Sequence, residues 1–247
     1  MRRVALYLYQ VYIWLIFFPL GLTLTFLSGW LTVLAAFVFS PRIASRYVAG
    51  TWARLIGWLT PMFVTVEGAQ YADPRRSFVV VCNHQSEYDI FLVYGWLKLD
   101  LKWVMKAELR KIPGVGIGCE KAGHIFIDRS NPEQARQAVR RALDQVGDGV
   151  GILFFPEGTR SMDGRLKGFK KGAFRTAAAQ GLPILPVTIV GTRDIQRPKS
   201  LLIFPGRVRL VIHPPIEVRG DSPEQIVELM QRTRDAINSA LPEPLRH

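Results

Sequence analysis

Residues 83–89, NHQSEYD, follow directly on the apolar run 77–82, SFVVVC, and lead into a second apolar run, 90–97, IFLVYGWL. A short apolar run that ends in polar residues before a longer one is typical of a strand followed by a helix. Ser86 and Asp89 match the S-x-x-D capping box, which predicts that a helix begins here. The capping box does not account for His84, which is therefore a candidate catalytic residue.

A second polar cluster follows another apolar run. The run 151–155, GILFF, is followed by 156–161, PEGTRS, which combines a proline and a glycine with Glu157 and Arg160. In open α/β sheets, ligands bind beyond the carboxyl ends of the strands, where such polar residues collect. We therefore expect the two clusters to meet at one site.

Beyond about residue 65, short apolar runs alternate with helical segments, which predicts one α/β domain. Asn131 with Pro132 predicts a helix that ends at Gly147, and Ser222 with Pro223 predicts a last helix that runs to about residue 241. The predicted strands are 78–82, 101–105, 124–127, 151–155, 184–190 and 208–212.

The N-terminal region is a membrane segment by composition. Residues 4–41 contain no Asp, Glu, Lys or Arg, and arginines flank this run of 38 residues. One helix of this length would be roughly 57 Å long, nearly twice the ~30 Å hydrocarbon core, so we expect the chain to fold back near Pro19 and Gly21. The hairpin could span the bilayer or lie in one leaflet, and a cleaved signal peptide is the alternative.

Residues 42–63 mix three arginines with tryptophans and aliphatic residues, which favours an interfacial helix on the lipid headgroups. We therefore divide the chain into residues 1–64, a membrane hairpin with an interfacial helix, and residues 65–247, an α/β domain. The positive flanks predict that both termini lie on the cytosolic side. We also expect an inner-membrane protein, integral or monotopic, with its active site on the same face.

The chain carries a formal net charge of +12, which favours anionic partners. Nucleic acid is disfavoured because the aromatic residues concentrate in the membrane segment and do not interleave with the basic ones. The segment 164–175, GRLKGFKKGAFR, has five cations and no acid, and could contact anionic membrane lipid or an acidic carrier. Cys82 and Cys119 lack C-x-x-C spacing, and a reducing compartment is expected.

His84 and Asp89 are the candidate catalytic pair. An imidazole oriented by a carboxylate can accept a proton from a hydroxyl near neutral pH, which attack on an acyl carbonyl requires. Three other interpretations stay open from the residues alone. Asp89 could be only a cap, Cys82 could be a nucleophile activated by His84, and His84 could bind a metal with His124.

Three cations follow predicted strands and could form a phosphate pocket. Arg160 follows the turn after 151–155, Arg129 ends the run HIFIDR, and Lys106 ends LKWVMK. A guanidinium at a strand end can bind phosphate with two hydrogen bonds, while backbone N–H groups of the neighbouring turn add donors.

Four motifs of this sequence resemble those of a known enzyme family and occur in the same order. NHQSEYD resembles the H-x-x-x-x-D signature of the glycerolipid acyltransferases, and GHIFIDR, FPEGTRS and ILPV are similar to their second, third and fourth motifs. The chain most resembles the 1-acyl-sn-glycerol-3-phosphate acyltransferases. The resemblance implies a central mixed sheet flanked by helices and transfer of a fatty acyl group to lysophosphatidic acid, which gives phosphatidic acid.

The resemblance also implies residue roles. His84 would be the general base and Asp89 its orienting carboxylate. The remaining site residues would bind the acceptor, and these are Lys106, Arg129, Glu157, Gly158, Thr159 and Arg160. No metal or cofactor is implied, and acyl-CoA or acyl carrier protein would be the donor. The alternatives are another lyso-lipid or glycerol-3-phosphate as acceptor, a membrane-associated thioesterase, and a non-catalytic binder of acidic lipid.

Overall fold

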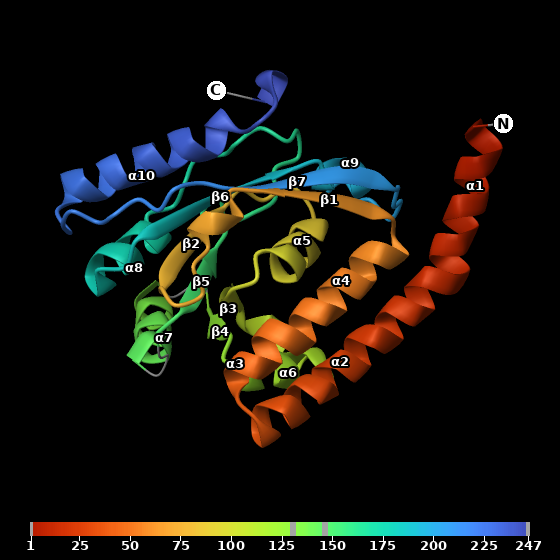
Figure 1. The fold of residues 1–247 in the computed structure, drawn as a ribbon, viewed down its shortest axis with the longest axis horizontal. Coiled ribbons are helices and arrows are strands. Elements are labelled where there is room, and N and C mark those ends of the chain that lie inside the picture. Colours follow the sequence, from red (N-terminus) through yellow and green to blue (C-terminus); the bar gives the residue numbers. More distant parts are fainter. Residues whose placement is uncertain (1, 129–131, 145–147, 246–247) are drawn as a thin grey trace.

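A computed structural model describes residues 2–128, 132–144 and 148–245. Its centre is a seven-stranded sheet in the order β1-β7-β6-β2-β5-β3-β4. Strands β6 and β7 pair antiparallel, and every other neighbouring pair is parallel. Helices cover both faces (Figure 1). The predicted α/β fold with a mixed sheet and flanking helices is confirmed.

The strands are β1 (Met62–Glu67), β2 (Phe78–Cys82), β3 (Asp100–Lys106), β4 (Ile125–Ile127), β5 (Val150–Phe154), β6 (Ile184–Val190) and β7 (Gly206–Ile212). The α-helices are α1 (Arg2–Tyr12), α2 (Phe18–Val38), α3 (Pro41–Ile43), α4 (Gly50–Leu59), α5 (Tyr88–Trp96), α6 (Val115–Lys121), α7 (Pro132–Asp144), α8 (Gly172–Gln180), α9 (Thr192–Ile195) and α10 (Pro223–Ser239). Shorter 3₁₀ or π segments are η1 (Ile13–Phe17), η2 (Ala44–Ala49), η3 (Ala69–Tyr71), η4 (Ala107–Lys111) and η5 (Glu243–Leu245).

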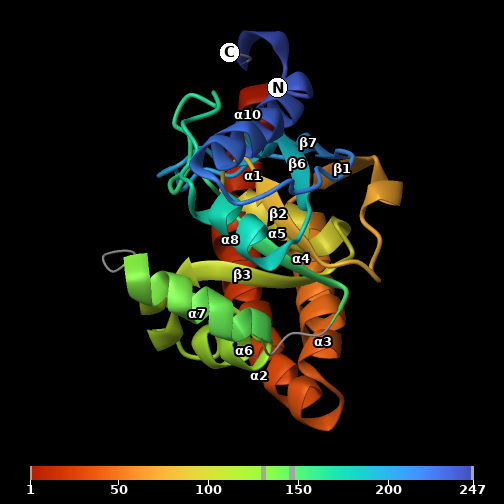
Figure 2. The ribbon, with the colours of Figure 1, turned by 90° about the vertical axis from the view of Figure 1, so that its left-hand side faces the viewer.

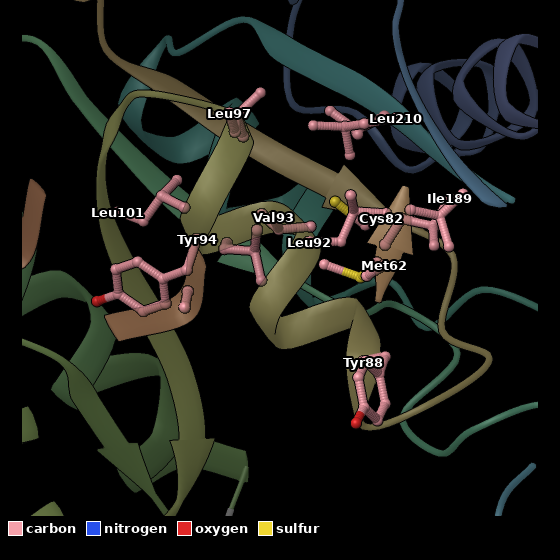
Figure 3. Close-up of a cluster of buried hydrophobic side chains, with 14 of the residues drawn as sticks. Met62, Cys82, Tyr88, Leu92, Val93, Tyr94, Leu97, Leu101, Ile189 and Leu210 are labelled. Carbon is pink, nitrogen blue, oxygen red and sulfur yellow. The ribbon is translucent and has the colours of Figure 1, made fainter. Parts of the chain in front are cut away.

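Strand β2 is buried on both faces, which explains why its sequence is a continuous apolar run. Alternate side chains point to opposite faces of a strand. Phe78, Val80 and Cys82 belong to the core that contains α5, and Val79 and Val81 belong to the core under α8 and α10. Figure 3 shows Cys82 beside Leu92 of α5. Three layers result, with β2 at the centre of the sheet.

Two predicted strands, 78–82 and 184–190, match the structure residue for residue, and the last helix opens with a capping box of Ser222 and Gln225. The sequence does not predict β1, because this strand begins within the segment 42–63 that is assigned to the interfacial helix. Exposed and partly buried side chains alternate along most of β1, as expected for a strand at the edge of the sheet. β1 therefore lies across the predicted boundary at residue 64. The predicted helix ends at Asn131 and Gly147 lie outside the described residues.

The predicted reversal at Pro19 and Gly21 is wrong. The helix continues from α1 through η1 into α2, and Pro19 lies in the first turn of α2, directly after the π-helical segment. A π turn already departs from the regular hydrogen-bond ladder, so the missing proline N–H costs little there. The chain reverses at Phe39 and Ser40 instead, where the Ser40 hydroxyl caps α3. Figure 1 shows α3 and α4 returning alongside α2.

The long N-terminal helix docks on the domain through small residues. Gly21, Gly29, Thr32 and Ala35 of α2 are buried, whereas most of its large apolar side chains are exposed. This arrangement reverses the usual pattern of a soluble helix, whose large apolar residues face inward. The segment Ala5–Val38 is long and apolar enough to cross a membrane. Its outward face therefore suits contact with lipid.

Gly29 gives α2 its close approach to α6 (Figure 2). A Cβ atom at Gly29 would overlap the carbonyl oxygen of Gly114, and a Cβ at Gly118 would lie 3.0 Å from the Gly29 Cα. Backbone atoms cannot move away as a flexible side chain can. Contact between the membrane helix and the domain therefore depends on the absence of these side chains.

We expect Gly29→Ala to lower the free energy of unfolding by about 1–3 kcal/mol, because the added methyl overpacks this contact. Thermal unfolding of the detergent-solubilised protein measures the effect. Gly172→Ala is the matched control, since its Cβ would meet nothing within 4 Å. Equal melting temperatures for the two variants would contradict the packing argument.

Candidate active site

The sheet brings the two polar clusters together, as the sequence predicts. β2 and β5 are neighbouring parallel strands, and Val81 pairs with Phe154 in their register. The residues that follow each strand therefore leave the sheet side by side. One of these loops carries His84 and the other carries Glu157 and Arg160.

His84 and Asp89 form a hydrogen-bonded pair, with 2.7 Å between His84 Nδ1 and Asp89 Oδ2. The Asp89 carboxylate is fully buried. Its Oδ2 also accepts hydrogen bonds from the backbone N–H groups of Gln85, at 2.6 Å, and Ser86, at 2.9 Å. When Nδ1 donates to the carboxylate, the lone pair for accepting a proton is on Nε2.

The capping role and the orienting role of Asp89 coexist. Asp89 accepts from the Ser86 N–H, which is one half of the predicted capping box. The Ser86 hydroxyl accepts from the Tyr88 N–H at 3.2 Å and donates to the Gln196 carbonyl at 2.8 Å. Glu87 is the residue at the cap of α5, so the helix begins one residue later than a box centred on Ser86 implies.

Thr192 is a site residue that the sequence analysis missed. Its hydroxyl donates to Asp89 Oδ1 at 2.5 Å, and its side chain is fully buried. Thr192 opens α9 two residues after the end of β6, the strand that pairs with β2 on the side away from β5. The rule that located the other two clusters, a polar residue after an apolar strand, would also have found Thr192.

The loop after β5 fixes the main chain of His84 on both sides. Glu157 Oε1 accepts the His84 N–H at 2.7 Å, and the Ser161 N–H donates to the His84 carbonyl at 2.8 Å. Glu157 Oε2 accepts the Lys167 N–H at 3.0 Å. Both oxygens of this carboxylate are therefore occupied by backbone donors.

Glu157 is almost fully buried. Burial raises the pKa of its carboxyl, and the two backbone hydrogen bonds partly oppose that rise. The resemblance implies that Glu157 binds the acceptor, whereas in the structure both of its oxygens accept backbone N–H groups. We therefore infer that Glu157 positions the loop after β2, residues 83–87, which we call the catalytic loop.

The face of the His84 ring stacks on Phe155, with 3.9 Å between ring centroids and 13° between ring planes. The imidazole is thus located by three neighbours, namely the Asp89 carboxylate, the Phe155 ring and its own fixed main chain. Cys82 is buried in the core, where burial holds the pKa of its thiol well above the usual value. This environment disfavours Cys82 as a nucleophile.

Arg160 reaches the catalytic loop, where its guanidinium forms an ion pair with Glu87. Both side chains are partly exposed. Thr159 accepts a hydrogen bond from the Lys167 ammonium at 2.7 Å, and Gly158 has a positive φ of 75° where the Lys170 side chain passes close by. Four of the predicted acceptor-binding residues therefore lie in one loop, next to His84.

Of the other two predicted cations, the one that the structure describes does not join this group. Lys106 is exposed at the end of β3, one strand beyond β5, and no interaction within the described part of the chain connects it to His84 or Arg160. Arg129 lies outside the described residues. His124 belongs to a separate network, in which its Nε2 lies 2.6 Å from the Tyr94 hydroxyl. Desolvation and the nearby Lys102 ammonium lower the pKa of His124 to about 3.

Comparison with known proteins agrees with this geometry. A model of the acyltransferase family matches residues 63–190, more than half of the chain. The chain belongs to this family. The matched region begins in β1, ends with β6 and contains the His84–Asp89 pair and the loop after β5.

Members of the family with curated names are similar over most of the chain. A 1-acyl-sn-glycerol-3-phosphate acyltransferase of Pseudomonas aeruginosa is 31% identical over 226 residues, 88% of this chain and 86% of that protein. One of Chlamydomonas reinhardtii is 32% identical over 207 residues, 83% of this chain. The chain spans 60% of the length of the Chlamydomonas protein and 56% of the length of its chloroplastic relative from Arabidopsis thaliana.

A solved structure has the same fold. The 1-acyl-sn-glycerophosphate acyltransferase PlsC of Thermotoga maritima matches with a TM-score of 0.75 and 31% sequence identity, over 94% of this chain and 95% of that one. The 94% coverage is larger than the matched family region and therefore extends beyond residues 63–190. Most of the N-terminal helical region therefore belongs to the shared architecture.

We expect Thr192→Val to lower kcat for acyl transfer about tenfold, because it leaves Asp89 Oδ1 buried without its hydroxyl donor. Thr192→Ser keeps the hydroxyl and should restore most of the rate. Steady-state kinetics of the three proteins test this, with thermal unfolding as a control for stability. A Thr192→Ser variant that is inactive but as stable as the wild type would show that the hydroxyl alone does not support the rate.

Proposed function

We propose that this acyltransferase moves a fatty acyl group from an acyl thioester to the sn-2 hydroxyl of 1-acyl-sn-glycerol-3-phosphate, which yields phosphatidic acid. The observation that carries the proposal is the oriented His84–Asp89 pair beside the Arg160 loop. A base for a hydroxyl and a cation for a phosphate are thus adjacent. The names of the similar proteins support the same acceptor.

In the proposed reaction His84 Nε2 accepts the proton of the acceptor hydroxyl. The oxygen attacks the thioester carbonyl carbon, and a C–O bond forms as the C–S bond breaks. The leaving thiolate takes the proton from the imidazolium. Asp89 stabilises the imidazolium through the 2.7 Å contact, and its own charge is balanced by its buried donors. No acyl-enzyme is required.

We propose that Arg160 binds the acceptor phosphate. Arg160 is paired with Glu87, and a partly exposed pair of this kind contributes little, about 0–1 kcal/mol. A phosphate can bind a guanidinium through two charge-assisted hydrogen bonds and can therefore displace the carboxylate. Glu87 at the cap of α5 remains favourably placed at the positive end of the helix.

We propose that the N-terminal helix lies within one leaflet of the inner membrane and faces the cytosol with its docked side. The helix contacts the α/β domain at two points along its length, Gln10 to Ile203 and Gly29 to Gly114, and it contacts α4 through Thr25 to Trp52. A helix attached in this way cannot cross the bilayer unless the domain enters it too. Acyl-CoA or acyl carrier protein would then approach from the cytosol.

Release of free thiol from acyl-CoA by the detergent-solubilised protein tests the reaction. We expect release that requires lysophosphatidic acid, and we expect His84→Ala to lower the rate about 10²–10⁴-fold because the general base is lost. Thiol release without any acceptor would identify a thioesterase instead.

The positioning role of Glu157 and the binding role of Arg160 predict different kinetic defects. Arg160→Ala should raise the acceptor KM about 10–100-fold, the loss expected for charge-assisted hydrogen bonds. Glu157→Gln, which replaces one backbone acceptor by a donor, should lower kcat and leave the acceptor KM within about twofold. Identical defects in both variants would refute the distinction between these roles.

A further inference from the structure

Two loops beside the catalytic loop expose apolar side chains. Met162 lies in the loop between β5 and α8 and is 55% exposed. Leu201 and Leu202 lie in the loop between α9 and β7 and are 65% and 49% exposed. We call these three residues the rim. Adjacent exposed leucines next to a reaction site indicate a contact surface.

Both loops are attached to the catalytic loop through its own polar side chains. The Gln85 amide donates to the Gly164 carbonyl at 3.1 Å, and the Ser86 hydroxyl donates to the Gln196 carbonyl at 2.8 Å. The first loop is also bonded to α9, which leads into the second loop, because the Arg193 guanidinium donates to the Met162 carbonyl at 2.9 Å. The rim is therefore part of the same body as His84.

The loop that carries the leucines has a defined conformation. The Gln196 amide donates to the Ser200 carbonyl at 3.0 Å, and the Ser200 N–H donates to the Arg197 carbonyl at 3.0 Å. Lys199 has a positive φ of 66°, which is uncommon for a residue other than glycine. The exposure of Leu201 and Leu202 is thus built into the turn.

The charges around the rim match an anionic lipid surface. Arg165, Arg197 and Lys199 are exposed, and Arg193 is half-buried. The exposed acids of these two loops and of α9 are Asp163, which accepts hydrogen bonds from Ser161 and Arg165, and Asp194. Apolar tips surrounded by an excess of cations are typical of segments that enter the interface of an anionic membrane.

The rim is continuous with the membrane helix. The Gln10 amide of α1 donates to the Ile203 carbonyl at 2.6 Å, one residue after Leu202. Ile203 is part of the buried core against which Tyr9 and Tyr12 of α1 pack. Figure 1 shows the α9–β7 loop beside α1, on the side of the sheet opposite α7.

We propose that the rim is a second membrane contact, which enters the same leaflet as the N-terminal helix. The proposal rests on the membrane placement given under Proposed function. The catalytic loop then lies between two lipid contacts, and a lysophospholipid enters the site from the bilayer without passing through water. Gln85 and Ser86 thereby fix the reaction site to the membrane surface.

An environment-sensitive nitrobenzoxadiazole label tests the depth of single positions in the full-length protein. Leu201→Cys is labelled in a Cys119→Ser background, since Cys82 is buried. Leu15→Cys, 72% exposed on the membrane helix, is the positive control, and Val227→Cys, 46% exposed on α10, is the negative control. The vesicles consist of phosphatidylcholine and phosphatidylglycerol. We expect blue-shifted emission, and quenching by spin-labelled lipid, at positions 15 and 201 but not at 227.

The pattern of outcomes separates the two proposals. A label at 201 that reports water while the label at 15 reports lipid overturns the rim proposal and leaves the membrane helix intact. A label at 15 that reports water overturns the membrane placement and the rim together. Kinetics give a second measurement: Leu201→Ser with Leu202→Ser should raise the acceptor KM severalfold on vesicles but not with a short-chain acceptor in solution. Equal KM values on vesicles would contradict the proposal.

Discussion

The buried Asp89 carboxylate determines how the site is arranged. A charge removed from water is tolerated only when several donors surround it. Asp89 receives four, from the His84 ring, the Gln85 and Ser86 N–H groups and the Thr192 hydroxyl. Three of them lie in the loop after β2 and the fourth lies after β6. The hydrogen bonds that stabilise the Asp89 charge therefore hold the ends of β2 and β6 together and orient the His84 imidazole.

The sequence predicted that β2 and β5 end at the site, but not that β6 does, nor which atoms meet there. Continuous apolar runs locate these strands, and the rule that ligands bind at strand ends brings His84 and Glu157 together. The direction of each side chain depends on contacts across distant segments. From its motif, Glu157 is therefore expected to bind the acceptor substrate. In the structure its oxygens accept hydrogen bonds from the N–H groups of His84 and Lys167.

Hydropathy located the N-terminal membrane segment, whereas the proline rule misplaced its reversal. Proline breaks a helix because it removes a donor and crowds the preceding turn. Both effects are absorbed when Pro19 follows a π segment and lies in the first turn of α2. Glycine in this helix allows close packing and does not mark the reversal, because Gly29 permits contact with the backbone at the start of α6. Packing against the domain is a tertiary constraint that a hydropathy profile does not contain.

The spacing of five between His84 and Asp89 has a physical reason in the four residues between them. Gln85 binds the loop after β5 and Ser86 binds the loop after α9, while Glu87 pairs with Arg160. Tyr88 is buried in the core and begins α5 (Figure 3). A shorter connection would lose one of these contacts, and a longer one would move Asp89 out of the first turn of α5. The His84–Asp89 pair, Arg160 and the two loops of the rim are thus all in contact with one segment of seven residues, 83–89.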